Sequence, residues 1–170
     1  MRTSSLCLVV ASGVAVACTG ACSGAEPDQV MDIVFDVCEP FVVSAPDATA
    51  VQREGIERGL ELWRERGVAA GSMAPTEGAP VVEVRFADAS PIFHGIYEDE
   101  EGVIYINRSL DDVEPLGIVV SHELGHAFGL WHVEHDDRRS VMNPGNLEIA
   151  PTSDDGIALT EMWGPCSLAQ

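Results

Sequence analysis

The segment HELGHAFGLWH, residues 122–132, holds three of the five histidines of this 170-residue chain. His122 and His126 are four residues apart, a spacing that places both on one face of a helix. Gly129 can adopt a positive φ, so the helix can end in a sharp turn that returns His132 to the same face. The segment therefore predicts a helix, a turn and three imidazoles that converge on one point.

Three converging imidazoles are a ligand set for zinc that leaves a fourth position open, as catalytic zinc sites do. We therefore expect one zinc ion with His122, His126 and His132 as metal ligands. Glu123 is adjacent to His122 and can reach a zinc-bound water without being a ligand, so it is the predicted catalytic residue. The alternative, histidines on an ordinary amphipathic helix, does not require this spacing.

The pattern H-E-x-x-H-x-x-G-x-x-H resembles the motif of the metzincin zinc metalloproteases. Metzincins also have a Met-turn, a tight turn whose methionine lies under the zinc. Ser140-Val141-Met142-Asn143-Pro144 is similar to this turn. The short interval after His132, and the Asp154-Asp155 pair after Thr152, are similar to the matrixin branch.

The resemblance implies a zinc-dependent endopeptidase that acts on protein or peptide substrates, with Glu123 as general base. It also implies that a strand at 103–107 is the edge along which the substrate pairs, and that residues 141–146 form a wall of the specificity pocket. One alternative is a non-catalytic zinc-binding envelope lipoprotein on a metzincin scaffold, which would have no need of Glu123. Another is a zinc hydrolase of non-peptide amides.

The sequence departs from the matrixin pattern in the loop before the active-site helix. Matrixins hold a second, structural zinc there with several histidines, whereas this chain has only His94. The acidic run 98–101 is instead a candidate site for calcium, which prefers oxygen ligands. Some metzincins have a tyrosine ligand two residues after the Met-turn methionine, but that position is Pro144.

The order of the remaining patterns predicts an α+β fold with a small mixed sheet. The resemblance implies a metzincin-like catalytic domain, in which a twisted sheet accompanies an active-site helix, the Met-turn and a C-terminal helix. The alternation of apolar residues predicts strands at 31–37, 81–86, 93–97 and 103–107. Helices are expected at 46–66, where Glu54 and Arg58 would pair, at 112–128, and after Thr152 as far as Trp163.

The N-terminal region predicts export. Residues 1–17 have the pattern of a signal peptide, 18–28 that of a tether, and 29–170 form the metzincin-like catalytic domain. The residues before Cys18 are similar to a bacterial lipobox, and lipidated Cys18 would attach a monomer to a membrane of the bacterial cell envelope. Ordinary cleavage after Ala17 or Ala21 would instead give a secreted protein.

The cysteines suggest a disulfide, which an exported protein can keep oxidised. Cys38 and Cys166 lie near the two ends of the predicted domain and are the expected pair. Pairing with Cys22 is the alternative.

The chain is strongly acidic, with a net charge of -19 from 28 acidic and 9 basic residues. Such a surface repels phosphate backbones, so we expect no nucleic acid partner. The acidity favours solubility, and a preference for basic substrates is a further reading that composition alone leaves open.

Overall fold

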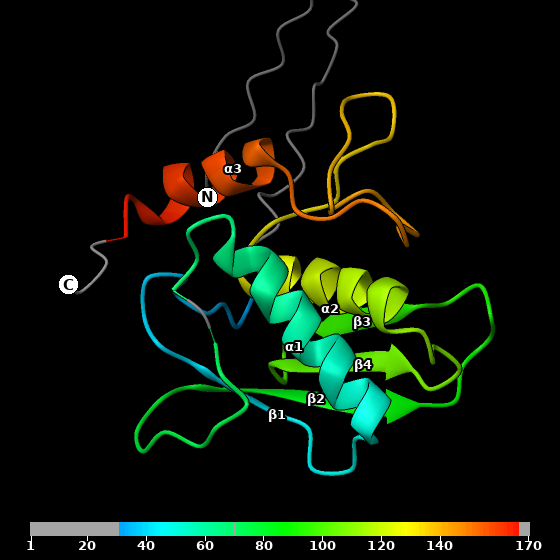
Figure 1. Ribbon diagram of the computed structural model, residues 1–170. Coiled ribbons are helices and arrows are strands. Elements are labelled where there is room, and N and C mark those ends of the chain that lie inside the picture. The colour runs from blue at the N-terminus through cyan, green and yellow to red at the C-terminus, as the bar shows by residue number, and fades with distance from the viewer. Residues whose placement is uncertain (1–30, 70, 167–170) are drawn as a thin grey trace, which may run out of the picture. The chain divides into compact units, whose positions relative to one another are not determined.

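The computed structural model describes residues 31–69 and 71–166, so the predicted signal peptide and tether lie outside the described residues. Its sheet contains β1 (Val42–Ser44), β2 (Val81–Ala87), β3 (Gly95–Glu98) and β4 (Val103–Asn107), in the order β1-β2-β4-β3. The β1–β2 and β2–β4 pairs are parallel and the β3–β4 pair is antiparallel (Figure 1). The predicted α+β class and mixed sheet are confirmed.

The edge of the sheet differs from the expected one. β4 pairs with β2 on one side and with β3 on the other, so the prediction that residues 103–107 form the free edge is wrong. The acidic turn between β3 and β4 is short, and it folds the two strands into a hairpin that occupies this side of β4. Within the described residues, β1 and β3 are the two strands at the ends of the sheet, and β1 has a further isolated bridge from Val42 to Ser72.

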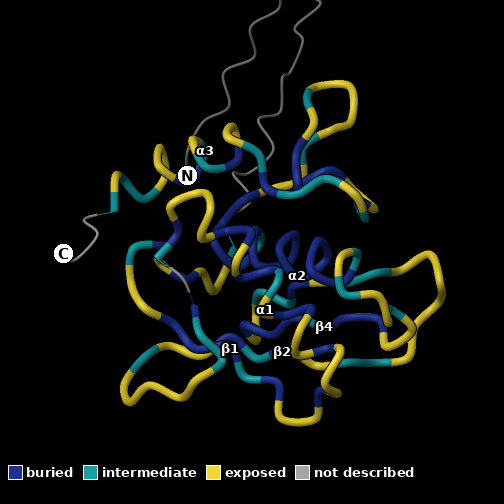
Figure 2. Tube along the Cα trace, viewed as in Figure 1, coloured by how far each residue is buried: buried dark blue, intermediate teal, exposed yellow. Residues whose placement is uncertain are grey.

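Two helices pack against each other on one face of the sheet (Figure 1): α1 (Ala50–Arg64) and α2 (Val113–Ala127). The inner face of α1 is apolar, with Ile56, Leu60 and Trp63 buried at four- and three-residue spacing. α2 is buried around almost its whole circumference (Figure 2), as expected of a helix between a sheet and a second helix.

The close approach of the two helices depends on glycine. A Cβ atom at Gly59 would lie 2.9 Å from the Cβ of Val120 and 3.0 Å from the carbonyl oxygen of Gly117, both in α2. Neither atom is the end of a flexible side chain. Gly59 therefore sets the distance at which α2, and the motif it carries, lies from α1.

α1 begins later than predicted. Thr49 is its N-cap and forms a capping box with Gln52, because this pair satisfies the free N–H groups of the first turn better than Pro46-Asp47 could. The predicted Glu54–Arg58 pair does not form. Arg58 instead contacts Glu61 in its own helix and Glu114 at the start of α2.

The predicted strand at 31–37 is wrong: the described residues there form turns and irregular backbone. Phe35 donates its backbone N–H to the carbonyl of Ala127 at the end of α2, so the segment binds a helix terminus rather than the sheet. The alternation reflects burial of Phe35 and Val37 only. The three-residue strand β1, which follows, is too short to give a periodic signal.

The C-terminal part is helix α3 (Ser153–Trp163), capped by Thr152 as predicted. Trp163 donates its indole N–H to the carbonyl of Phe128, and a disulfide joins Cys38 to Cys166 beyond the helix. This pairing agrees with the expected one, while Cys22 lies outside the described residues. The loop closed by the bond spans 128 residues, for which chain entropy gives about 4–5 kcal/mol of stabilisation.

None of the helices in residues 31–69 and 71–166 combines the length and the apolar character that crossing a membrane requires.

Two Gly→Ala substitutions in helices should have opposite effects. G59A should lower the free energy of unfolding, because overpacking of about 1–3 kcal/mol exceeds the gain in helix propensity of about 0.5–1 kcal/mol. G156A in α3 should keep the gain in helix propensity without overpacking. The atom nearest to the added Cβ would be the carbonyl oxygen of Arg66, at 3.4 Å, which is ordinary van der Waals contact. Urea unfolding of both variants measures the contrast, and equal effects would contradict the packing described here.

Candidate metal centre

The end of α2 forms a Schellman motif, as the sequence HAFGL predicts. Gly129 has φ +96° and donates its N–H to the carbonyl of His126, while Leu130 donates to the carbonyl of Gly125. This turn reverses the chain within two residues. It returns the carbonyl of Leu130 toward the ring of His126, and it brings His132 back beside the helix.

Two backbone carbonyls fix the tautomers of the helical histidines. The Nδ1 atom of His122 lies 2.7 Å from the carbonyl oxygen of Val141, and the Nδ1 atom of His126 lies 2.8 Å from that of Leu130. A carbonyl can only accept, so both Nδ1 atoms carry the hydrogen. In the neutral rings the Nε2 atoms then carry no hydrogen, and their lone pairs are available to bind a metal ion.

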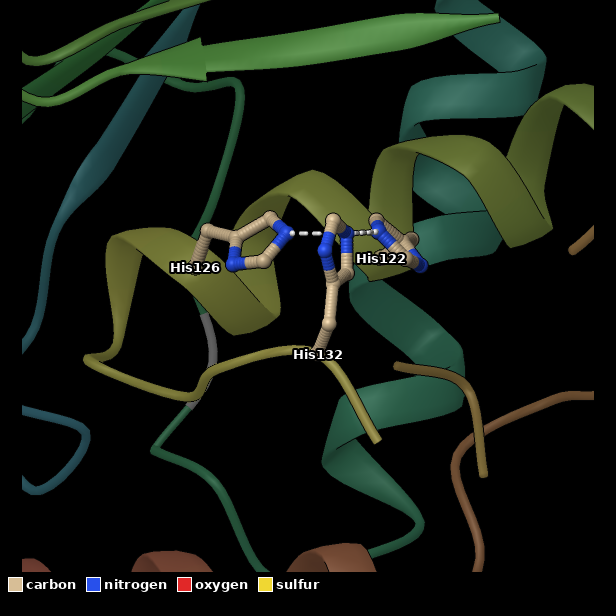
Figure 3. Close-up of side chains that lie close together, drawn as sticks. All are labelled: His122, His126 and His132. Atoms are coloured by element: carbon tan, nitrogen blue, oxygen red, sulfur yellow. Dashed lines mark hydrogen bonds between the residues drawn. The ribbon is translucent and has the colours of Figure 1, made fainter. Parts of the chain in front are cut away.

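The three Nε2 atoms face one another (Figure 3). The Nε2 atom of His132 lies 3.2 Å from the Nε2 atoms of both His122 and His126. His132 could donate at most one hydrogen to these two bare nitrogens, so hydrogen bonding alone cannot satisfy the group. The arrangement fits a cation at the centre, and these three histidines could hold a metal ion.

The spacing also suits the size of a tetrahedral ion. Two nitrogens at zinc–nitrogen bond lengths of about 2.0–2.1 Å and a tetrahedral angle are about 3.3 Å apart. The observed separations of 3.2 Å are close to this value. The predicted convergence of His122, His126 and His132 is therefore present in the fold.

The surroundings keep the rings neutral. Burial lowers the pKa of His122 to about 4 and that of His126 to about 4, and the neighbouring imidazoles act in the same direction. Burial also lowers the pKa of His132, which is the most exposed of the three. Neutral imidazole is the form that binds a metal ion.

Glu123 lies on the other side of His122, between α2 and the edge strand. Its side chain is buried, and burial raises its pKa to about 8, against the effect of a backbone hydrogen bond at Tyr97. Gly95 at the start of β3 leaves room for it: a Cβ there would lie 2.7 Å from Oε1 of Glu123. The carboxyl group therefore lies against the backbone of β3, beside the three histidines.

A cleft of about 440 Å³ contains these groups. The three histidines and Glu123 line it, and β3 contributes Ile96. Trp131 and the loop residue Phe93 are partly exposed and add apolar surface. Of the predicted wall at 141–146, the residues that reach the cleft are 144–146, while Val141 and Met142 are buried beneath it.

The segment 140–144, where the sequence resembles a Met-turn, forms a turn that packs against α2. Met142 is buried, and a Cβ at Gly125 would collide with its sulfur atom, so the methionine packs against the helix between the two helical histidines. Met142 also accepts the backbone N–H of Val133, next to His132. The turn thus supports both the helix and the segment that carries the third histidine.

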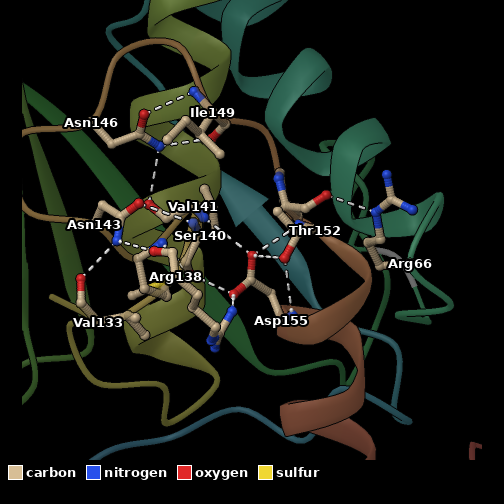
Figure 4. A network of polar contacts seen from close by, with 12 residues as sticks. Arg66, Val133, Arg138, Ser140, Val141, Asn143, Asn146, Ile149, Thr152 and Asp155 are labelled. Carbon is tan, nitrogen blue, oxygen red and sulfur yellow. Dashed lines mark hydrogen bonds and ion pairs between the residues drawn. The ribbon is translucent and has the colours of Figure 1, made fainter. Parts of the chain in front are cut away.

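A buried carboxylate ties this turn to α3 (Figure 4). Asp155 accepts hydrogen bonds from the hydroxyl of Ser140 (2.5 Å), the backbone of Val141 (3.1 Å) and Thr152, and it pairs with Arg138 at 2.7 Å. Burial acts to raise its pKa, but these donors together lower it. In the sequence, Asp155 stands out only as a member of the Asp154-Asp155 pair, since its contacts with residues 138–141 are tertiary.

Other predicted features are not brought together. In the described residues, the histidine trio is the one group of three or more His, Cys, Asp or Glu side chains placed to share a metal ion, and the side chains of the acidic run 98–101 are not gathered into such a group. His135 is exposed and contacts the carbonyl of Pro144 at 3.1 Å, apart from the trio. His94 lines the cleft without joining the ligand set.

Comparisons with known proteins gave no match: no protein-family model matches the sequence, and no curated protein matches it.

Removal of one imidazole should abolish tight metal binding. We expect H132A to weaken zinc binding by more than the roughly 10–100-fold that loss of an outer-sphere partner costs, because it removes one of three donors. H135A is the matched control in the same loop, and it should bind one zinc as wild type does. Chelator competition measures both, and equal affinities would show that His132 is no ligand.

Loss of the Asp155 charge should destabilise the protein in a pH-dependent way. Because the pKa of Asp155 is lowered by folding, its contribution is present above the unfolded value of about 3.9 and is lost as the pH falls through the folded value. D155N should therefore cost at least about 2 kcal/mol at pH 7. The gap to wild type should narrow below about pH 4.

The neighbouring, exposed Asp154 supplies the control for this experiment. D154N changes the same charge in the same helical turn and should have a small effect at every pH. Urea unfolding of wild type, D154N and D155N across pH gives the comparison, and a pH-independent gap for D155N would refute the assignment.

Proposed function

We propose that this protein is a zinc-dependent endopeptidase of the metzincin type, with His122, His126 and His132 as zinc ligands and Glu123 as general base. The observation that carries the proposal is the fixed tautomer of His122 and His126, which aims two bare nitrogens at the Nε2 atom of His132. Three imidazole donors with no fourth protein ligand are typical of catalytic zinc sites. The Met-turn under the site supports the same assignment.

Zinc bound there would act as a Lewis acid and bring the pKa of a water molecule to around neutrality. The chain's own contribution to proton transfer is the carboxylate of Glu123, which faces the same cleft. One of its oxygens accepts the proton of the attacking water and then delivers it to the nitrogen of the leaving amine. A buried carboxylate is suited to this task, because its pKa lies nearer to neutrality than that of an exposed one.

The sheet edge supports a polypeptide substrate. β3 has one free side and borders the cleft through Gly95, Ile96 and Tyr97. An extended peptide can add to such an edge through main-chain hydrogen bonds, whatever its sequence. β3, in place of the strand at 103–107, is therefore the edge that would hold the scissile bond beside Glu123.

Replacement of the base should separate chemistry from metal binding. We expect E123Q to lower kcat by about 10²–10⁴-fold, since it removes general acid–base catalysis. It should still bind one zinc, because Glu123 is not among the three ligands. Digestion of a peptide library, with and without a chelator, measures the activity, and E161Q on the exposed face of α3 is the charge-matched control.

Two outcomes would oppose the proposal in different ways. Wild-type cleavage by E123Q would show that the base is another residue. Stoichiometric zinc binding by the wild type without cleavage of any peptide would favour the non-catalytic zinc-binding module over the enzyme.

A further inference from the structure

Asn146 occupies an unusual place at the boundary between the cleft and the metal centre. It lines the cleft at the end of the predicted pocket wall, yet it is only 8% exposed. It is not a zinc ligand and has no part in the proton transfer described above. Its side-chain amide nevertheless donates two hydrogen bonds and accepts two, so it holds the surrounding backbone in place.

All four hydrogen bonds of this amide are to backbone, and Figure 4 shows those with Val141 and Ile149. Nδ2 donates to the carbonyls of Val141 (3.1 Å) and Ile149 (2.7 Å). Oδ1 accepts the N–H groups of Glu148 (3.1 Å) and Ile149 (2.8 Å). One side chain thus closes the loop 146–149 on itself and ties it to the Met-turn.

The carbonyl of Val141 is the atom that links Asn146 to the metal centre. This oxygen also accepts the Nδ1 hydrogen of His122, at 2.7 Å. A carbonyl oxygen has two lone pairs, so it can accept from both donors at once. The second donor holds the Val141 peptide in the orientation that faces His122, and partners of this kind set ligand orientation and basicity.

We propose that Asn146 is a positioning residue that couples the wall of the cleft to the His122 ligand through the Val141 carbonyl. Its amide keeps that carbonyl aimed at Nδ1, so His122 presents a bare Nε2 atom before any ion arrives. The proposal rests on the zinc site of the proposed function, but not on peptide hydrolysis. It applies equally to a site that binds zinc without catalysis.

The central experiment compares N146A with N107A. Asn107 is also buried, and its side chain also makes several hydrogen bonds to backbone, in the loop 89–93 and at Ser109. None of these bonds involves a predicted zinc ligand or a carbonyl bound to one. Both variants should lower the melting temperature. Only N146A should weaken zinc binding, by roughly 3–10-fold, below the 10–100-fold typical of a direct partner of a ligand.

A second measurement needs no metal. Ring ¹⁵N chemical shifts of His122 in the metal-free protein at neutral pH report which nitrogen carries the hydrogen. Wild type and N107A should show the Nδ1–H tautomer, whereas N146A should show a measurable share of Nε2–H. A purely structural role for Asn146 would lower the melting temperature without changing this ratio.

N146D serves if N146A does not fold. The carboxylate retains acceptors for the N–H groups of Glu148 and Ile149 but has no donor for Val141. The inference is overturned if the folded variant keeps both the wild-type zinc affinity and an undisturbed His122 tautomer. A wild type that binds zinc but cleaves no peptide would remove the proposed activity and leave this test intact.

Discussion

The candidate metal centre depends on two backbone carbonyl oxygens, those of Val141 and Leu130, because they decide which nitrogen of each helical histidine is free. Each carbonyl is set by a separate local structure. The turn at Gly129 orients Leu130, and the turn at 140–144, held by Asp155, orients Val141. Since hydrogen-bond strength falls steeply with misalignment, both turns must keep their geometry for the three Nε2 atoms to converge.

The sequence was most informative where a contact is local. The spacing of His122 and His126, the turn at Gly129 and the cap at Thr152 all act within a few residues, and each lies where the pattern predicts. The trio itself could be predicted for the same reason. Its third member is only six residues from the second, and one glycine determines the path between them.

Prediction failed where distant segments compete for the same partner. The apolar alternation at 31–37 predicted a strand, but the end of α2 offers Phe35 a carbonyl that the sheet does not. The family resemblance placed β4 at the edge, and the strand's own sequence could not correct this, because it does not encode strand order. Asp155 gave no local signal of its contacts with the turn at 140–144, since these partners are fixed by how the loop and α3 meet.

The exposed side of β3 has a consequence for self-association. A strand with one free edge and an exposed apolar side chain such as Ile96 is a template for pairing with an identical strand from another molecule. The acidic run 98–101 begins at the end of this strand, and the whole chain carries a charge of -19. Like charge on identical molecules opposes dimers along this edge, so the chain's own acidity protects the exposed side of β3 from self-pairing.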